Sequence, residues 1–432
     1  MSGYGETLSF LYGLQYRGMK FGLRNILSLL ADTGHPERAF HSIHVAGTNG
    51  KGSTSSLIAS AYAEAGLRTG LYTSPHLLSF TERIRINGEE IPEARLVEYV
   101  RLLRDAIELR QATFFEATTC VAFLYFADEA VDVAVIEAGL GGRLDATNVL
   151  RPLVSVITNI GLEHTEYLGN TIAKIAREKG GIIKMGIPVV TASADPVALS
   201  VLRTIASRKS APFFEARTLV RLLPAARGKG YALSAGKLRI PPVIPVLTGR
   251  HQEMNARLAL AALLLAGRRS GRTQAVPPPS PRNIARGFSR VTRNTGIRGR
   301  FQYVGRGKRV LIDVAHNPDG IKVLTAMIRE MRRKPAVAVL GVMKDKEYGA
   351  MLRELGQVCP IIVAVAPRLD RALSARKLFE TGKAMGLRMA FGGTVARGLA
   401  RARAIAGEGT ILLTGSHYVA GEGLKALVGE NA

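Results

Sequence analysis

Residues 44–53 read HVAGTNGKGS and contain the residue types that bind a phosphate group. The glycines let backbone N–H groups turn toward an anion, Lys51 supplies a positive charge, and Ser53 supplies a hydroxyl that can ligate a metal ion. A strand is expected before this stretch and a helix over 55–65 after it, so the dipole of the helix start adds to the attraction. The spacing departs from G-x-x-x-x-G-K-[ST] because Gly52 separates Lys51 from Ser53. The sequence therefore predicts a phosphate-binding loop rather than a plain glycine turn.

Polar side chains also follow three other expected strands. Ser74 opens a Ser-Pro-His triplet, Glu137 closes the apolar run 131–136, and the pair Glu163-His164 comes after another apolar run. Ligands of open α/β sheets bind at the carboxyl ends of the strands. A carboxylate beside a phosphate loop suits Mg²⁺, which takes one or two carboxylates together with phosphate oxygens. Each residue alone could be a solvated or structural group, but their recurrence at successive strand ends favours a metal-assisted phosphate site.

Two further sets of residues extend the expected site. The glycine-rich segment 138–148 follows Glu137 and carries Arg143 and Asp145, which can recognise polar ligand groups. Later in the chain, three segments follow expected strands in the same way, at 313–318, 341–346 and 414–417. Each is a common kind of strand-to-helix loop, but together they indicate a second wall of the active site.

The elements that must position these residues alternate between strands and helices. Strands are expected over 42–46, 69–73, 131–136, 154–158, 187–191, 310–314, 336–340, 361–366 and 410–414. Helices are expected over 55–65, 93–109, 118–130, 171–183, 252–266, 320–332, 348–355, 374–385 and 394–406. A loop is expected over 228–245 and a linker over 292–299. This alternation predicts an α/β fold built mainly from parallel sheets.

Two domains are expected in a chain of 432 residues. Residues 1–297 would form a P-loop domain that carries the phosphate-binding loop. Residues 298–432, which contain no phosphate loop, would form a smaller Rossmann-like, doubly wound domain that completes the cleft.

The composition limits the classes of function. The net charge of +25 is compatible with nucleic acid or another polyanion, but aromatic residues make up only 6% and Trp is absent, which does not favour base stacking. The basic residues are scattered, with a denser region at 282–309 that is either a solvated surface or a functional groove. No apolar run approaches the roughly 18–20 residues of a membrane span. Cys120 and Cys359 lie far apart, and no signal peptide is evident, so a cytoplasmic protein is expected.

Taken together, these motifs resemble the folylpolyglutamate synthase/dihydrofolate synthase family of the muramyl-ligase superfamily. The resemblance extends nearly end to end, and the glycine between Lys51 and Ser53 is typical of it. The motifs that carry it are 44–53, 74–76, 137–148, 163–164, 178–184, 249–256, 299–302, 313–318, 341–345 and 414–416.

The resemblance implies an ATP-dependent ligase of folate biosynthesis. ATP would phosphorylate the carboxylate of dihydropteroate or of a folate, and the amine of L-glutamate would displace phosphate from the acyl phosphate. Mg²⁺ and Lys51 would offset the repulsion between the two anions. The partners implied are dihydropteroate, folates and L-glutamate, with no obligatory nucleic acid, no membrane and a monomeric state.

The resemblance also assigns roles to individual residues. The catalytic residues implied are Lys51, Lys179 and His316. ATP would be bound by Thr48, Asn49, Gly50, Lys51, Asn255, Arg300 and Asp313. Two Mg²⁺ sites would be formed by Ser53, Ser74, Glu137, His164 and Lys179, the lysine being carbamylated in the family. Substrate contacts would fall at Lys20, Phe21, Gly22, Thr113, Phe114, Phe115, Glu116, Leu144, Asp145, Ala146 and Ser416, with Ser416 near the glutamate site and the others near the pterin.

The chain departs from the family pattern at three positions. Glu163 stands where Asp usually precedes the metal-binding His, Gly180 replaces an Ala, and Arg298 replaces a common Pro. None of these changes removes an implied ligand. The segments 300–302 and 313–316 resemble the bacterial members that perform both reactions, so dual dihydrofolate and folylpolyglutamate synthase activity is expected. A folylpolyglutamate synthase alone, another muramyl-type ligase, and a nucleic-acid-stimulated NTPase are the alternatives.

Overall fold

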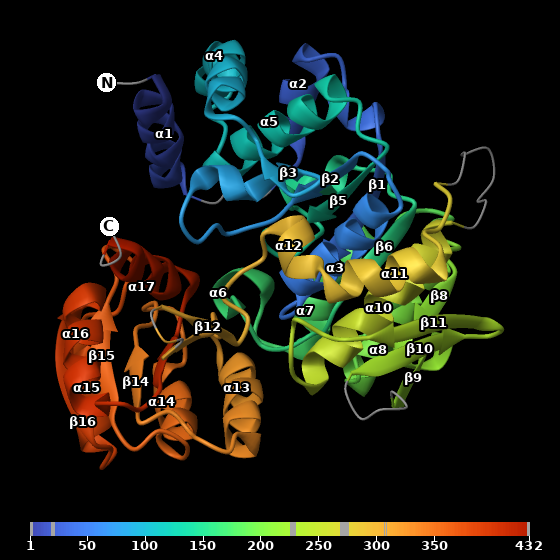
Figure 1. Ribbon diagram of the computed structural model, residues 1–432. Coiled ribbons are helices and arrows are strands. Elements are labelled where there is room, and N and C mark those ends of the chain that lie inside the picture. The colour runs from blue at the N-terminus through green and yellow to red at the C-terminus, as the bar shows by residue number, and fades with distance from the viewer. Residues whose placement is uncertain are drawn as a thin grey trace. The chain divides into compact units, whose positions relative to one another are not determined.

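The structure is a computed structural model that describes residues 3–18, 22–224, 230–267, 276–305, 307 and 309–429. The chain forms two compact units (Figure 1). The larger comprises Met1–Pro75, Phe80–Val246 and Arg250–Ile297, and the smaller comprises His76–Ser79, Leu247–Gly249 and Arg298–Ala432. Within the described ranges, no helix has the length and apolar character needed to cross a membrane.

The larger unit is built on an eight-stranded sheet with the order β4-β3-β2-β5-β1-β6-β7-β8, parallel from β2 to β8. Its strands are β1 (His41–Ala46), β2 (Thr69–Tyr72), β3 (Ile84–Ile86), β4 (Glu89–Glu90), β5 (Val133–Glu137), β6 (Val154–Ile157), β7 (Val189–Thr191) and β8 (Phe213–Glu215). Its helices are α1 (Gly3–Gly13), α2 (Arg24–Asp32), α3 (Lys51–Glu64), α4 (Glu93–Leu109), α5 (Phe114–Asp128), α6 (Thr165–Leu168), α7 (Ile172–Lys179), α8 (Pro196–Arg208), α9 (Ala216–Leu219), α10 (Arg250–Ala266), α11 (Pro281–Ser289) and α12 (Val291–Thr295).

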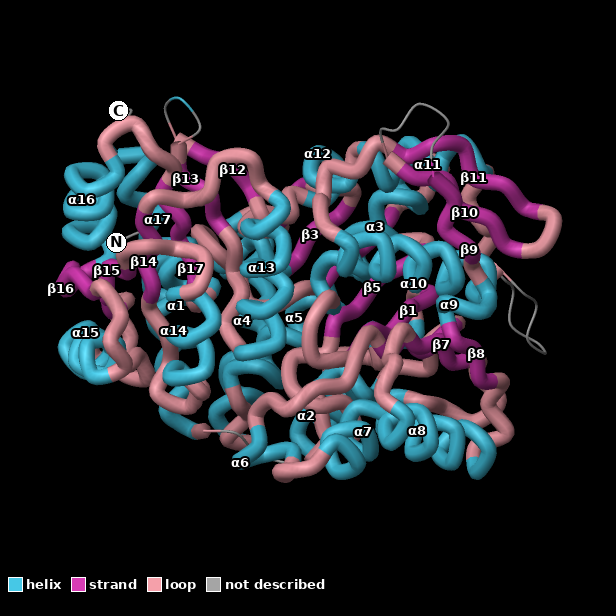
Figure 2. The backbone as a smooth tube through the Cα atoms, turned by 90° about the horizontal axis from the view of Figure 1, so that it is seen from below, coloured by secondary structure: helices cyan, strands magenta, loops and turns pink. Residues whose placement is uncertain are grey.

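Helices cover both faces of this sheet. Helices α3 and α10 pack on one face, and α5, α7 and α8 pack on the other (Figure 2). Strand β1 lies at the centre, and five of its six residues are buried because both of its neighbours are parallel strands covered by helices. The register pairs Val45 with Glu137 and Ala46 with Ile157, so the carboxyl ends of β1, β5 and β6 meet at one edge. The expected site residues follow these strand ends.

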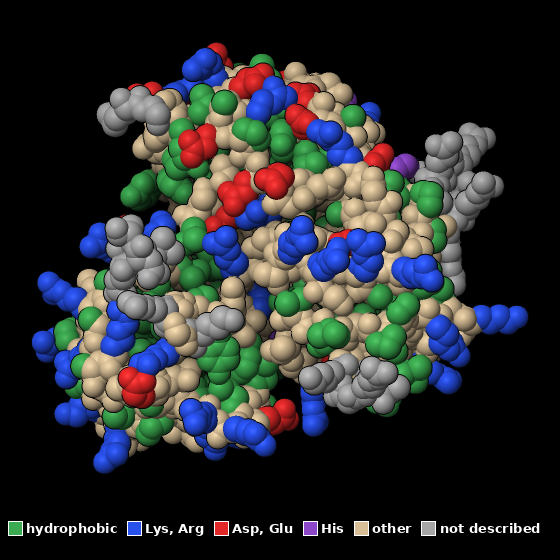
Figure 3. All heavy atoms as spheres, in the orientation of Figure 1, with side chains coloured by type: hydrophobic (Ala, Val, Ile, Leu, Met, Phe, Trp, Pro, Cys, Tyr) green, Lys and Arg blue, Asp and Glu red, His purple; other side chains and the backbone are tan. Residues whose placement is uncertain are grey.

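Helix α3 is held in place by α11 and α12. A Cβ on Gly287 would lie 2.7 Å from Ala61 Cα, so α11 can approach α3 this closely only because residue 287 is glycine. Ser60 Oγ donates to Gly287 O at 2.7 Å, and Arg286 in the basic region pairs with Glu64 at 3.1 Å. Lys and Arg side chains lie over α11 and α12 in Figure 3. Part of the basic region 282–309 therefore packs against α3, the helix that begins at the phosphate-binding loop, and stabilises its position.

The expected loop over 228–245 is wrong. The described residues of this segment form β10 (Tyr231–Ala235) and β11 (Leu238–Val243), which pair antiparallel in the order β11-β10-β9 with β9 (Arg221–Pro224). Tyr231, Leu233, Ile240 and Val243 are buried, because this small sheet packs against α11. Two of the prolines that suggested a loop, Pro241 and Pro242, lie in β11, an edge strand, where a missing N–H is tolerated.

The smaller unit has a six-stranded sheet with the order β12-β13-β17-β14-β15-β16, in which β12 alone runs antiparallel to its neighbour. Its strands are β12 (Gln302–Val304), β13 (Val310–Ile312), β14 (Val337–Leu340), β15 (Ile362–Ala366), β16 (Met389–Thr394) and β17 (Ile411–Thr414). Its helices are α13 (Pro318–Glu330), α14 (Tyr348–Gly356), α15 (Ala375–Ala384), α16 (Val395–Ala406) and α17 (His417–Gly429).

This second sheet is doubly wound, as expected. Val337 and Val339 pack with α16 and α17 on one face, and Ala338 and Leu340 pack with α13, α14 and α15 on the other. The expected linker over 292–299 is only partly correct, because α12 extends through Thr295. A helix also begins earlier than expected at α3, which starts at Lys51, and at α5, which starts at Phe114.

Candidate active site

The phosphate-binding loop leads directly into the first turn of α3. Gly50 is the N-cap in a left-handed conformation (φ 86°), and the first bond within the helix runs from Thr54 N–H to Gly50 O at 2.9 Å. The N–H groups of Lys51, Gly52 and Ser53 therefore do not reach a carbonyl in their own helix. Three donors, the positive end of the helix dipole and the Lys51 side chain converge on one site, which is the arrangement that binds a phosphate anion.

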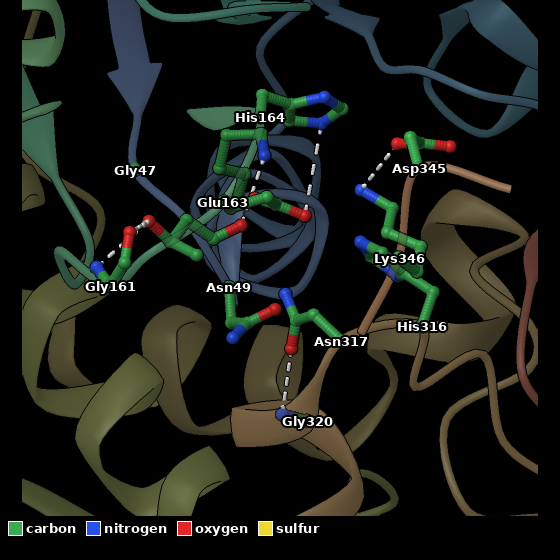
Figure 4. A network of polar contacts seen from close by, with 12 residues as sticks. Gly47, Asn49, Gly161, Glu163, His164, His316, Asn317, Gly320, Asp345 and Lys346 are labelled. Atoms are coloured by element: carbon green, nitrogen blue, oxygen red, sulfur yellow. Dashed lines mark hydrogen bonds and ion pairs between the residues drawn. The ribbon is translucent and has the colours of Figure 1, made fainter. Parts of the chain in front are cut away.

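The loop is braced from the end of β6. Thr48 N–H donates to Asn159 O at 2.8 Å, and Asn49 N–H donates to Asn159 Oδ1 at 2.7 Å. Thr48 Oγ1 also exchanges hydrogen bonds with the backbone of Gly161, as Figure 4 shows. The backbone donors of Thr48 and Asn49 are thus used inside the protein. Sequence reasoning missed Asn159, whose only local signal is a polar residue directly after an apolar strand.

Two glycines in the loop are required by close approach. Gly47 has φ 146°, and a Cβ there would lie 1.8 Å from Thr158 Oγ1. A Cβ on Gly50 would lie 2.6 Å from Asn255 Oδ1. Asn255, expected to bind nucleotide, therefore lies directly against the loop from α10.

Two lysines converge on carbonyls of the loop. Lys51 Nζ donates to Thr48 O at 3.2 Å, and Lys179 Nζ donates to Gly47 O at 2.7 Å. Lys179 is only 2% exposed and ends α7, where a cation is favoured by the helix dipole. The structure therefore brings Lys179 to the phosphate-binding loop, across 132 residues of sequence.

The residues expected to hold metal arrive from separate strand ends. Ser74 N–H donates to Glu137 Oε2 at 3.3 Å, so these two residues are together. His164 is the N-cap of α6 at φ 50°, and its Nε2 lies 3.8 Å from Glu163 Oε1 (Figure 4). No group of three or more His, Cys, Asp or Glu side chains suited to a metal occurs in the described part of the chain. Hydroxyls and phosphate oxygens would have to supply the other ligands, so the metal set stays a prediction.

Asp145 organises the glycine-rich loop that follows β5. Its Oδ2 accepts from Leu140 N–H at 2.8 Å, and its Oδ1 accepts from Thr147 N–H at 3.0 Å. Burial raises the pKa of Asp145, and these hydrogen bonds oppose the rise. Leu144 is half-buried and Ala146 is buried beside it. The Asp145 carboxylate therefore stabilises the conformation of the loop 138–148 through these hydrogen bonds.

His44 lies beneath this loop with a strongly lowered pKa. Thr147 Oγ1 donates to Asp145, so the Nε2–H of His44 must be the donor in its 2.7 Å hydrogen bond to Thr147 Oγ1. His44 Nδ1 is buried and has no hydrogen-bond partner among the described residues. A proton on Nδ1 would therefore be an unpaired buried charge. Burial, with a smaller effect from Lys184, lowers the pKa of His44 to about 3.

We expect His44 to make the larger unit acid-sensitive. The unfolded imidazole binds a proton below about pH 6.5 and the folded one does not, so stability falls as pH falls from about 6.5 to about 3. At pH 5 the loss amounts to about 2 kcal/mol. His44→Gln should flatten the decline in the urea midpoint between pH 7.5 and 5, whereas His41→Gln, a half-exposed residue of the same strand, should leave it in place. An unchanged slope in His44→Gln would contradict this assignment.

The expected pterin segment at Thr113–Glu116 is a helix cap. Glu116 Oε2 accepts from Thr113 N–H at 2.8 Å, and Thr113 Oγ1 accepts from Glu116 N–H at 3.3 Å, which together form a capping box. The rings of Phe114 and Phe115 lie 6.0 Å from those of Tyr12 and Tyr72 respectively. Gly22 has φ 153°, and Lys20 and Phe21 lie outside the described residues. Pterin contacts at these positions stay predictions.

In the smaller unit, Asp313 holds two backbone segments together. It accepts from Phe301 N–H at 3.0 Å and from Ala315 N–H at 2.9 Å. Burial raises its pKa, and the positive charge of Arg300 opposes the rise. Arg300 therefore lies near enough to Asp313 to act on its charge, and the expected contacts of both residues with ATP stay predictions.

His316 and Ser416 follow strands β13 and β17 of this unit. His316 Nδ1 lies 3.0 Å from Val314 O, and because a carbonyl oxygen can only accept, Nδ1 is the donor in this hydrogen bond. The His417 ring lies 5.6 Å from that of His316. Ser416 is buried, and its Oγ accepts from Val419 N–H at 3.1 Å at the start of α17. Lys346 pairs with Asp345 at 3.3 Å after the neighbouring β14 (Figure 4).

Gln252 is a buried residue of the site that lies within the motif 249–256 but was given no role from the sequence. It lies one turn before Asn255 on α10 and donates to Ser53 Oγ at 3.4 Å. Its spacing of three residues from an expected ligand on a helix could have indicated it, because such residues share a face.

The comparisons with known proteins agree with this architecture. Residues 45–216 match the Mur ligase middle domain, and residues 299–417 match the Mur ligase, glutamate ligase domain. The fold and the phosphate-binding loop therefore define an ATP-dependent ligase of the Mur ligase type.

Individual relatives identify the family within this class. The chain is 35% identical to the dihydrofolate synthase/folylpolyglutamate synthase of Bacillus subtilis over 88% of this chain and 89% of the relative. It is 32% identical to the Escherichia coli protein of the same name over 88% and 85%. The chain belongs to the folylpolyglutamate synthase/dihydrofolate synthase family.

Solved structures show the same fold over nearly the whole chain. Escherichia coli FolC in complex with DHPP and ADP superposes with a TM-score of 0.85 at 28% identity, covering 99% of this chain and 98% of that one. Mycobacterium tuberculosis folylpolyglutamate synthase, complexed with ADP and AMPPCP, gives 0.87 at 30% identity and covers 99% of both chains. The mostly parallel α/β fold and the ATP-binding character predicted from sequence are confirmed.

Proposed function

We propose that this chain joins L-glutamate to dihydropteroate and to reduced folates in an ATP-dependent reaction. The single observation that carries the proposal is the phosphate-binding loop, in which the first-turn N–H groups of α3 and the side chain of Lys51 converge. Membership of the family supports the substrate class.

The reaction proceeds in two balanced steps. A carboxylate oxygen of the pteroate or folate attacks the γ-phosphorus, the bond to the ADP oxygen breaks, and an acyl phosphate forms. The glutamate nitrogen then attacks the acyl carbon, the carbon–oxygen bond to phosphate breaks, and the nitrogen loses a proton. The first step brings two anions together, so the N–H groups of Lys51 to Ser53 and the Lys51 ammonium lower its barrier by holding the phosphates.

Mg²⁺ suits the residues gathered near the loop. The donors are the hydroxyls of Ser53 and Ser74, the carboxylate of Glu137 and the imidazole of His164, and a hard cation prefers the oxygens among them. Glu137 is 4% exposed and accepts from Ser74 N–H, which holds its carboxylate beside Ser74. Bound there, Mg²⁺ would neutralise phosphate charge. Lys179 would contribute to such a site only as a carbamate, because an ammonium carries no lone pair.

The remaining assignments complete the proposal. Asn255, Arg300 and Asp313 contact the nucleotide, His316 acts near the transferred phosphoryl group, and Ser416 binds glutamate. Residues 1–297 act as the ATP-binding domain and residues 298–432 complete the cleft. We further propose a cytoplasmic monomer, a setting that agrees with the two unpaired, buried cysteines.

The test is product analysis with two acceptors side by side. Protein, ATP, Mg²⁺ and L-glutamate are incubated with dihydropteroate in one reaction and with tetrahydrofolate in the other, and products are identified by mass spectrometry. We expect one added glutamate in the first reaction and one or more in the second. Product from tetrahydrofolate alone would reduce the function to folylpolyglutamate synthase. Product from neither acceptor would overturn the proposal, and ATP hydrolysis stimulated by DNA or RNA would point to a nucleic-acid-dependent NTPase.

A further inference from the structure

Two buried amide side chains of α10, those of Gln252 and Asn255, lie beside the phosphate-binding loop and the first turn of α3. Gln252 is 4% exposed and Asn255 is 7% exposed. Asn255 Nδ2 donates to Gln252 Oε1 at 2.9 Å, and Gln252 Nε2 donates to Ser53 Oγ at 3.4 Å. A continuous chain of hydrogen bonds therefore runs from Asn255 through Gln252 to the hydroxyl in the first turn of α3.

In the structure this chain of hydrogen bonds runs in one direction. Asn255 offers its NH₂ group to Gln252, so the carbonyl oxygen of Gln252 must face Asn255. The NH₂ group of Gln252 then faces Ser53, and Ser53 Oγ can only accept from it.

This direction determines what the Ser53 hydroxyl can do. A hydroxyl has one proton and two acceptor lone pairs. One lone pair of Ser53 Oγ receives the Gln252 donor, which leaves the second lone pair for a cation and the proton for an anionic oxygen. An amide that donates to Ser53 thus holds the hydroxyl in the orientation that a Mg²⁺ ligand needs, before any metal binds.

We propose that Gln252 is a positioning residue that orients the Ser53 hydroxyl toward Mg²⁺. Through its second hydrogen bond, Gln252 also links that hydroxyl to Asn255, which lies against Gly50 of the loop. Gln252 does not itself touch the reacting atoms. The position of Asn255 is set by contact with the loop, because its Oδ1 lies 2.6 Å from where a Cβ on Gly50 would be. A nucleotide that moves Asn255 therefore also moves the donor on Ser53. The inference rests on the proposed binding of Mg²⁺ and nucleotide at this loop.

A residue that only filled space would behave differently. Gln252→Met keeps the length and volume of the side chain but removes the donor and the acceptor, whereas Gln252→Asn keeps the amide and shortens its reach. If packing is the only role, Gln252→Met is close to neutral. If orientation is the role, both variants weaken the Mg²⁺-dependent part of nucleotide binding.

The experiment measures binding of a fluorescent ADP to the full chain, with Mg²⁺ and with EDTA. For both Gln252 variants, we expect affinity with Mg²⁺ to fall about five- to ten-fold, which is the loss of one buried hydrogen bond, while affinity in EDTA stays within about two-fold. Ser53→Ala should show the same selectivity, and the double variant Ser53→Ala/Gln252→Met should be no weaker than Ser53→Ala alone. Gln357→Met, an exposed glutamine of the smaller unit, is the matched control and should change neither value.

The outcomes separate this inference from the proposed function. If the wild-type chain binds no ADP in Mg²⁺, the proposed function fails and this inference falls with it. If the wild type binds ADP and both Gln252 variants match it, or if the variants lose affinity equally with Mg²⁺ and in EDTA, the positioning role alone is overturned. Additive losses in the double variant would also overturn it.

Discussion

Gly47→Ala should weaken nucleotide binding about 100-fold or more while the chain remains folded. The new Cβ would lie 1.8 Å from Thr158 Oγ1 and 3.0 Å from Thr158 N, and backbone atoms at the end of a central strand cannot move aside cheaply. The loop must shift instead, which misaligns the N–H groups at the start of α3. The loss of two such hydrogen bonds amounts to about 3 kcal/mol, or about 100-fold in affinity. Titration with fluorescent ADP measures it.

Gly66→Ala is the matched control for this prediction. Gly66 also has a positive φ, of 85°, but a Cβ there would meet nothing within 4 Å. It lies just after α3, at the opposite end from the phosphate-binding loop. Its substitution should lower the free energy of unfolding by about 1 kcal/mol, the cost of a left-handed residue with a side chain, and leave ADP affinity unchanged. Equal affinities in Gly47→Ala and wild type would show that the loop does not bind the nucleotide phosphates.

The central parallel strands were predictable because they are continuous apolar runs, whereas the short or edge strands β3, β4, β8, β12 and β16 were not expected. Strands β1, β5 and β6 are apolar runs covered by helices on both faces, and their expected bounds differ from the observed ones by one or two residues. The start of α3 was not predictable in the same way. Its first turns contain Gly52, Ser53, Thr54 and Ser55, which have low helix propensity, yet packing buries residues 53 to 62 and overrides that propensity.

The candidate site was predictable in its composition but not in its contacts. The strand-end rule places Lys51, Ser74 and Glu137 at one edge of a parallel sheet without any structure. It does not reveal that Asn159 uses the backbone donors of Thr48 and Asn49, because that depends on the pairing of β1 with β6. Nor does it show that Asp145 and Glu116 are already engaged in a loop and a helix cap.

Lys179 shows why the contacts matter for mechanism. The family resemblance implies a carbamylated metal ligand at this position, and the sequence alone suggests an ordinary lysine in the last turn of a helix. In the structure the amine is 2% exposed and donates to the carbonyl of Gly47, the first glycine of the phosphate-binding loop. The amine therefore holds the loop directly, and a carbamate would hold it through a metal.

Lys179→Ala should lower kcat about 100-fold, with a smaller effect on the KM for ATP. The change leaves the buried Gly47 carbonyl without its ammonium donor, which costs about 1–3 kcal/mol, and it removes the carbamate if one forms. Lys174→Ala is the matched control, because Lys174 lies on the same helix with an exposed side chain. Turnover measured by ADP release should be unchanged in that control.

Small molecules that replace the missing group distinguish the two forms of Lys179. If Lys179 acts as the carbamate that the family resemblance implies, formate or acetate should restore part of the turnover of Lys179→Ala, and the wild type should lose activity when bicarbonate and CO₂ are removed. Restoration by ethylamine instead would assign the role to the ammonium that donates to Gly47. Full turnover in Lys179→Ala without any addition would exclude Lys179 from the mechanism. Lys179 both donates to the loop carbonyl of Gly47 and is the residue that would hold the metal as a carbamate. The single substitution Lys179→Ala therefore tests the loop contact and the metal role together.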